Sequence, residues 1–161
     1  MLTRRLFLAT VAAAGAVGPL PVWAADFEIA HTEAEWRKRL TPAQFAVLRD
    51  HETEQPFSNS LRGETSALLK EDRAGTYDCA GCALPVYASD TKYDSGTGWP
   101  SFWEALPNAV GYAADNSFFS RRTEVHCRRC GGHLGHVFDD GPKPTGKRHC
   151  LNGLAMTFSP A

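Results

Sequence analysis

The chain has 161 residues, of which 43% are hydrophobic, and these values fit one globular domain plus a removable leader. The formal net charge of -1 provides no basic surface, so we expect neither nucleic acid nor acidic lipid as a partner. Fourteen glycines and ten prolines predict many turns, and therefore short strands instead of long helices. No coiled-coil heptad indicates assembly, and we expect a monomer.

The first 24 residues have the features of an export signal. A basic start with Arg4 and Arg5 is followed by an apolar run over 7–17 and by small residues over 22–24 that a signal peptidase accepts. The paired arginines resemble a twin-arginine signal, which exports proteins already folded. An ordinary secretory signal and a retained anchor are the alternatives, although the apolar run is short for a span of about 20 residues. We predict cleavage after Ala24, a mature domain over 25–161, a periplasmic or otherwise exported location, and no stable membrane insertion after cleavage.

Two short helices are predicted at the start of the mature domain. The segments 32–35 and 41–44 each fit a capping box, and Pro42 occupies a first helical position, where its missing N–H costs nothing. The segment 51–75 is polar and turn-rich, which indicates an irregular loop with a short helix over 66–70. Short strands follow, so we expect a mainly antiparallel β domain with helices at its N-terminal end.

Four of the five cysteines form two CxxC turns, next to predicted strands over 84–88 and 117–127. Each turn presents two thiolates, which is half of a tetrahedral four-cysteine zinc site. A filled tetrahedron has no open position, so such a zinc ion would be structural. Two disulfides are the alternative in an exported protein, and we interpret the adjacent His126 as a bystander and not a ligand. The predicted zinc ligands are Cys79, Cys82, Cys127 and Cys130.

A glycine-containing loop over 94–103 ends in three aromatic residues. Pro100 restricts Trp99 to an extended conformation, which fixes the direction of the indole. An indole face suits a methyl thioether or its oxide, because sulfur and methyl groups both pack well on aromatic rings. We therefore predict a binding role for Trp99, and we expect Phe102 and Trp103 to belong to the core.

The segment 131–153 concentrates reactive side chains. If residues 147–154 form a strand, Arg148, Cys150 and Asn152 project from one face of it. Cys150 is the cysteine left over from the two CxxC turns, so it is either buried and inert or kept for its reactivity. A neighbouring guanidinium favours thiolate and lowers the thiol pKa below its ordinary value of about 8.5. We therefore predict that Cys150 is a nucleophile.

Two histidines lie in the same segment among three glycines. His133 and His136 are too close to glycine for a stable helix, so we expect a bent, bulged strand or loop that aims both rings at one point. Imidazole titrates near pH 6.5 and can donate a proton at working pH. Either histidine is a candidate general acid.

From Leu40 onward the chain resembles the methionine-R-sulfoxide reductases of the MsrB type. The shared marks are the two CxxC pairs, the blocks 91–102 and 131–153, and the closing segment 154–158. The resemblance implies two antiparallel sheets and a structural zinc ion on the four paired cysteines. It implies these roles: catalysis by Cys150, contact of the substrate methyl group with Trp99, support of the thiolate by Arg148, and binding and protonation of the sulfoxide oxygen by His133, His136 and Asn152.

The sequence departs from many relatives at two positions. Their resolving cysteine commonly lies just before GWPSF, where this chain has Thr97. With four cysteines committed to metal, we expect a one-cysteine cycle in which a thioredoxin-like or small thiol reduces the Cys150 sulfenic acid. His149 stands where the family usually carries an aromatic residue, and we expect it to be structural.

The function expected from this resemblance is peptide-methionine (R)-S-oxide reduction, as repair of oxidised exported proteins. Two other classes of protein remain open on the residues alone. A zinc-knuckle binding module would need the CxxC turns but not Cys150, Trp99 or the histidines. A disulfide-stabilised secreted domain would need its cysteines paired.

Overall fold

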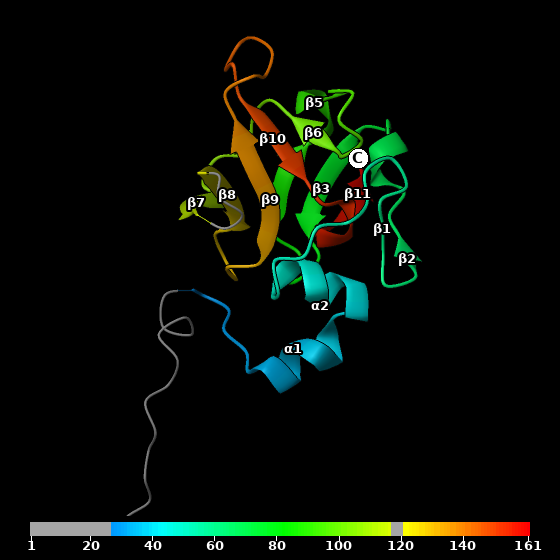
Figure 1. Cartoon of the computed structure of the whole chain (residues 1–161). Helices are drawn as coiled ribbons and strands as arrows, with labels where there is room; N and C mark the ends of the chain where they lie inside the picture. The colour runs from blue at the N-terminus through cyan, green and yellow to red at the C-terminus, as the bar shows by residue number, and fades with distance from the viewer. Residues whose placement is uncertain (1–26, 117–120) are drawn as a thin grey trace, which may run out of the picture.

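The computed structural model describes residues 27–116 and 121–161. The predicted leader, 1–24, lies outside these residues, as do positions 117–120 of the predicted strand 117–127. Strands dominate the described part, and the helices are short (Figure 1). Among the described residues, no helix is both long and apolar enough to cross a membrane.

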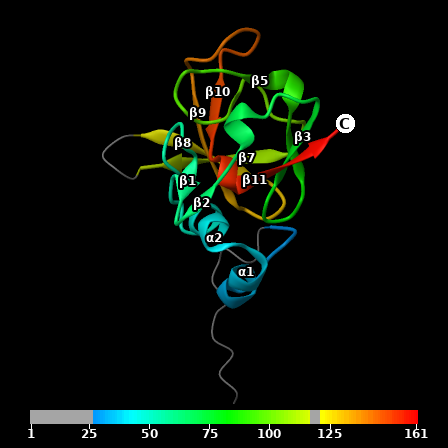
Figure 2. The same ribbon diagram turned by 90° about the vertical axis from the view of Figure 1, so that its right-hand side faces the viewer.

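Two capped helices begin the described domain, as the sequence predicts. Helix α1 spans Glu33–Arg39 and helix α2 spans Pro42–Leu48. In each, the threonine before the helix accepts a hydrogen bond from the third helical N–H, and that residue's side chain accepts one from the threonine N–H. Both helices lie at one end of the β structure in two perpendicular views, with α2 against the strands (Figures 1 and 2).

All the strand pairs are antiparallel, which confirms the expected mainly β fold with two main sheets. A two-stranded hairpin is additional. The six-stranded sheet has the order β5-β6-β10-β9-β8-β7, with β5 Lys92–Tyr93, β6 Ser101–Phe102, β7 Val110–Asp115, β8 Arg122–Cys127, β9 His133–Phe138 and β10 Arg148–Leu151. The three-stranded sheet has the order β11-β3-β4, with β3 Gly75–Cys79, β4 Pro85–Ala88 and β11 Met156–Pro160; the hairpin pairs β1 Ser60–Leu61 with β2 Glu64–Thr65. Short 3-10 helices are η2 Leu68–Lys70, η3 Ser89–Thr91 and η5 Gly153–Ala155.

Aromatic side chains join the two main sheets. Phe102 of the six-stranded sheet packs on Tyr77 and Tyr87 of the three-stranded sheet, with ring centroids 4.9 and 4.6 Å away. His149 faces the same core, where its Nδ1 is hydrogen-bonded to the Tyr87 hydroxyl at 2.8 Å and burial lowers its pKa to about 4. The core prediction is therefore right for Phe102 and wrong for Trp103, which is only half-buried in the bend that follows β6. The structural role expected for His149 agrees with this placement.

Strand β9 contains the expected bulge. Val125 pairs with Gly135 and His126 pairs with His133, so Leu134 is an extra residue without an opposite partner. An extra residue shifts the alternation of side chains by one position. His133 and His136, three residues apart, consequently face the same side of the sheet.

Gly135 makes a close backbone approach to β10 at this bulge. A Cβ atom at position 135 would lie far inside van der Waals contact of the Cys150 carbonyl oxygen. We expect Gly135→Ala to lower the free energy of unfolding by about 1–3 kcal/mol, because backbone and not a flexible side chain must move. Urea denaturation monitored by tryptophan fluorescence measures this change.

Gly63→Ala is the matched control, since Gly63 has a φ of +83° and open space around the added methyl group. Its cost is backbone strain alone, about 1 kcal/mol. Equal losses in the two variants would contradict a steric role for Gly135.

Candidate active site

Strand register places the predicted nucleophile in a row of polar residues. Cys150 of β10 lies opposite Ser101 of β6 on one side and opposite His136 of β9 on the other. His136 lies in turn opposite Glu124 of β8. Directly opposed residues of antiparallel strands share a face of the sheet. The reactive face is therefore a product of pairing register, and Cys150 stands between a hydroxyl group and an imidazole.

A small pocket of about 120 Å³ opens over this row. It brings Trp99 together with three predicted site residues of the segment 131–153, namely His136, Cys150 and Asn152. Thr53, Arg122, Gly135, Phe138 and Leu151 complete its lining. The indole Nε1 of Trp99 donates a hydrogen bond to the Glu54 carbonyl at 3.1 Å, which fixes the ring at the rim. The arrangement suits a compact apolar group that carries one polar atom.

The resting thiol of Cys150 has a raised pKa, contrary to the expectation from sequence. Burial raises it, and the Thr97 hydroxyl and the Arg148 guanidinium, in that order, oppose the rise. Arg148 is shared with Asp140, to which its Nε and Nη2 donate at 2.8 Å each. A guanidinium paired with a carboxylate stabilises a thiolate less than a free one does. Asp140 was not predicted from the sequence, although it lies only eight positions from Arg148.

A chain of hydroxyl groups leads to the sulfur. The Thr97 Oγ1 is 3.8 Å from the Cys150 Sγ and 2.8 Å from the Ser95 Oγ. The Ser95 Oγ is in turn 2.7 Å from the Ser101 Oγ. The Ser101 hydroxyl donates to the Trp99 carbonyl at 3.2 Å. The Ser95 hydroxyl can then donate to Thr97, and the Thr97 hydroxyl to a thiolate. Thr97 therefore supplies a hydrogen bond to the Cys150 sulfur.

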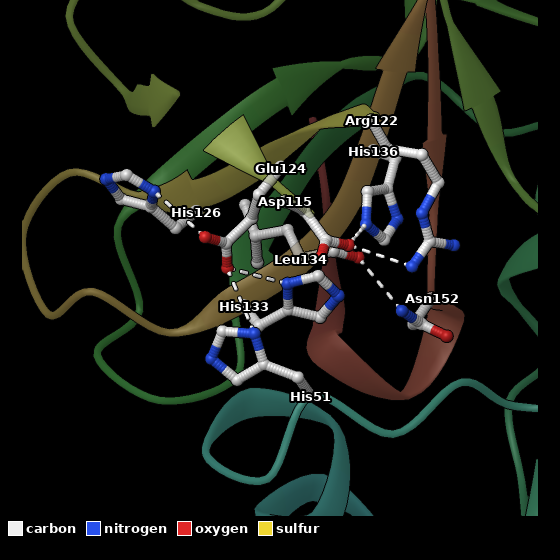
Figure 3. Close-up of polar contacts among 9 residues, drawn as sticks. All are labelled: His51, Asp115, Arg122, Glu124, His126, His133, Leu134, His136 and Asn152. Atoms are coloured by element: carbon white, nitrogen blue, oxygen red, sulfur yellow. Dashed lines mark hydrogen bonds and ion pairs between the residues drawn. The ribbon is translucent and has the colours of Figure 1, made fainter. Parts of the chain in front are cut away.

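His136 is held by a carboxylate at the pocket wall. Its Nε2 donates to the Asp115 Oδ2 at 2.7 Å, and the same oxygen accepts from the Arg122 Nη2 at 2.8 Å (Figure 3). Burial lowers the pKa of His136, and the bond to Asp115 opposes that shift only in part. The ring is therefore mainly neutral near pH 7, and its protonated form is a stronger acid than an exposed histidine.

His133 lies behind His136 and not in the pocket wall. The side chain is 2% exposed, its ring centroid is 5.3 Å from that of His136, and its Nδ1 donates to the Glu124 Oε1 at 2.7 Å. Its buried Nε2 has no hydrogen-bond partner among the described protein atoms. The structure thus brings one of the two predicted histidines to the pocket and places the other as its neighbour.

Asn152 and Trp99 are both hydrogen-bonded to the backbone of Glu54, a residue that was not predicted from the sequence. The Asn152 Oδ1 accepts from the Glu54 N–H at 3.0 Å, and its Nδ2 donates to the Leu134 carbonyl at 3.2 Å. The Glu54 carboxylate is buried and accepts from Asn59 Nδ2, Gly153 N and Leu154 N at 2.7, 2.7 and 2.9 Å. Two of these partners lie about 100 positions later in the chain, so no local pattern predicts the burial of Glu54.

The four CxxC cysteines form one cluster, apart from the pocket. The Sγ atoms of Cys79 and Cys130 are 3.7 Å apart, those of Cys82 and Cys127 are 3.5 Å apart, and all four lie within 4.8 Å of one another. Tetrahedral zinc with bonds of about 2.3 Å requires sulfur separations of about 3.8 Å. A disulfide requires about 2.05 Å, and all four cysteines are free. The donor set therefore fits a metal ion and not two disulfides, and His126 is no part of it.

Comparison with known proteins links this geometry to one family. The sequence matches the SelR domain over residues 40–160. Relatives from Agrobacterium fabrum and Leifsonia xyli, each named peptide methionine sulfoxide reductase MsrB, are both 48% identical, over 80% and 84% of this chain and 91% and 94% of their own length. A relative of the same name from Methanosarcina barkeri is 48% identical over 79% of this chain and 85% of its own.

The hydroxyl chain predicts how a change at Thr97 alters the thiol. We expect Thr97→Val to slow alkylation of Cys150 near pH 7 by about three- to tenfold, because a hydrogen bond worth about 1 kcal/mol to the thiolate is lost. The rate of iodoacetamide labelling across a pH series measures the effect. Thr97→Ser retains the donor and should label as the wild type does. Equal rates for the valine and serine variants would exclude this role.

Proposed function

The chain belongs to the SelR-domain family of MsrB-type methionine-R-sulfoxide reductases, and on that premise we propose that it reduces methionine-R-sulfoxide in oxidised proteins, with Cys150 as nucleophile. The observation that carries the assignment is the 120 Å³ pocket, which gathers Cys150, Trp99, His136 and Asn152 on one face of the sheet. Neither a knuckle-type binding module nor a disulfide-stabilised domain requires this arrangement.

The proposed reaction transfers one oxygen atom from substrate to enzyme. The substrate methyl group rests on the Trp99 indole, and the Cys150 thiolate attacks the sulfoxide sulfur. Protonation of the oxygen by His136 weakens the sulfur–oxygen bond, and Asn152 offers its remaining amide N–H to the same oxygen. The protonated oxygen then passes from the substrate sulfur to the Cys150 sulfur as the transient bond between the two sulfur atoms breaks. Methionine leaves as the thioether, and Cys150 is left as a sulfenic acid.

The other predicted site residues support this pocket from outside it. Arg148, oriented by Asp140 and with its guanidinium carbon 4.4 Å from the Phe138 ring centroid, stabilises the charge of Cys150. His133 contacts His136 edge to face and holds it in place from behind. We assign the proton to His136 because it faces the pocket and His133 does not.

We propose that Cys79, Cys82, Cys127 and Cys130 hold one structural zinc ion. When bound, the ion neutralises and fixes four thiolates and leaves no coordination position for substrate. It would connect the turn after β3 to the turn between β8 and β9, and so close the segment 83–126, which includes the Trp99 loop.

We also propose that the sulfenic acid is reduced from outside. The four clustered cysteines are committed to metal, and Thr97 occupies the place beside Cys150 that a resolving thiol would need. A thiol of a thioredoxin-like protein, or a small thiol, would attack the Cys150 sulfur, release the oxygen as water and form a mixed disulfide. A second thiol of the reductant would then break that disulfide and restore the Cys150 thiol. The predicted leader 1–24 supports an exported location and a role in repair of exported proteins. We propose that the protein acts as a monomer.

A single-turnover experiment tests the one-cysteine cycle. Incubation with a peptide methionine-R-sulfoxide and no reductant should give about one methionine per chain, because Cys150 is consumed as sulfenic acid. Mass spectrometry after denaturing alkylation should show no disulfide to Cys150.

Two variants control this experiment. Cys150→Ser should release no methionine while it keeps the wild-type circular dichroism spectrum. Thr97→Cys should form a disulfide with Cys150 after one turnover, because the replaced oxygen is 3.8 Å from that sulfur. Methionine release by Cys150→Ser, or a native disulfide at Cys150, would refute the mechanism.

Metal analysis tests the cysteine cluster. We expect one zinc ion per chain, and we expect its removal with a chelator under reducing conditions to lower the melting temperature by on the order of 10 °C or more. Elemental analysis and thermal denaturation measure the two quantities. Re-addition of zinc should restore stability. Protein that contains no zinc and whose four clustered cysteines resist alkylation until reduced would support disulfides instead.

A further inference from the structure

A second cluster of metal-ligand side chains lies apart from the four cysteines. Glu124 stands among three imidazoles: its Oε1 is 2.7 Å from His133 Nδ1 and 3.5 Å from His51 Nδ1, and its Oε2 is 3.9 Å from His126 Nδ1 (Figure 3). The reductase chemistry proposed above involves neither His51 nor His126. From this convergence we propose that His51, Glu124 and His133 form a binding site for a divalent transition-metal ion.

The separations are close to those that coordination requires. One ligand atom from each of His51, Glu124 and His133 lies within 4.8 Å of the other two. Metal bonds of about 2.1 Å to imidazole nitrogen and carboxylate oxygen place neighbouring ligand atoms about 3.4 Å apart. The 3.5 Å separation already matches, and the 2.7 Å separation needs to widen by less than about 1 Å, which rotation of the carboxylate provides.

The backbone holds His51 where its ring completes the set. His51 has a φ of 59°, in the left-handed region that costs a residue with a Cβ atom about 1 kcal/mol or more. In this conformation its ring stacks on that of His133, with centroids 4.6 Å apart and planes 21° apart. Both Nδ1 atoms consequently point at the same carboxylate oxygen (Figure 3).

Solvent can supply the remaining coordination positions. A surface pocket of about 520 Å³ is lined by His51, Glu124 and His126, and therefore reaches two of the three proposed ligands directly. Arg49, a cation, also lines this pocket, but it donates to the Cys130 carbonyl at 3.1 Å and its guanidinium carbon lies 5.0 Å from the Trp36 ring centroid. Protein ligands thus occupy one side of the site and the surface pocket lies on the other, as in metal sites that keep an exchangeable water.

The donor set selects the class of ion. Two imidazoles and one carboxylate suit zinc, iron(II), cobalt(II), nickel(II) and copper(II), whereas magnesium and calcium prefer oxygen ligands alone. This site borders the row that contains Cys150, because Glu124 lies opposite His136 and His133 contacts the His136 ring, but it would exist whether or not the chain reduces sulfoxides.

Cobalt(II) is the probe for this site. The experiment uses Cys150→Ser protein that contains one zinc ion per chain, so that the four-cysteine cluster is occupied, the proposed site is free of zinc, and the free thiol cannot compete for the metal. We expect isothermal titration to show one cobalt ion bound per chain, and native mass spectrometry to show that ion in addition to the zinc. We expect His51→Ala and Glu124→Gln each to weaken cobalt binding at least tenfold.

His31→Ala is the matched control, because His31 lies outside the cluster and its removal should leave cobalt affinity unchanged. His51 is an exposed loop residue, so its replacement tests the site without a buried cavity. Cobalt binding of unchanged affinity in His51→Ala, or no stoichiometric binding to the parent protein at millimolar cobalt, would overturn the proposal.

Discussion

The buried carboxylate and backbone of Glu54 are the constraint on which the pocket depends. Its carbonyl holds the Trp99 indole, its N–H holds the Asn152 amide, and its side chain accepts the first N–H groups of the turn that follows Cys150. Burial raises the pKa of Glu54 in spite of three hydrogen bonds. Burial of this carboxylate costs desolvation energy. The same residue aligns Trp99 with the strand that contains Cys150.

Opposing influences act on the pKa of the Cys150 thiol. Burial favours the neutral form, whereas the hydroxyl of Thr97 and the guanidinium of Arg148 favour the anion. Pairing of Arg148 with Asp140 weakens the second influence. A thiol that is not strongly ionised at rest reacts less with adventitious oxidants, since the thiolate is the reactive form. Under the proposed mechanism, bound substrate then changes the balance between thiol and thiolate, because its sulfoxide oxygen is a proton acceptor beside His136.

Features with a local cause could be predicted from the sequence, and features with a distant cause could not. The two capping boxes depend on residues three positions apart, and the structure has both. Counting the cysteines was enough to separate Cys150 from the clustered four. The partners of the histidines were missed, because Asp115 and Glu124 reach them only through the register of β7, β8 and β9. Glu54 was missed for the same reason, since its partners follow almost a hundred residues later.

The bulge at Leu134 determines the sequence spacing of the two histidines. On a regular strand, histidines that share a face occur at even spacings, and here the inserted residue makes the spacing three. A search for the same geometry in unrelated β proteins should therefore look for two histidines separated by one residue on a straight strand. Conversely, deletion of Leu134 would remove the bulge and leave the two histidines two positions apart on a regular strand, where both rings still share one face of the sheet.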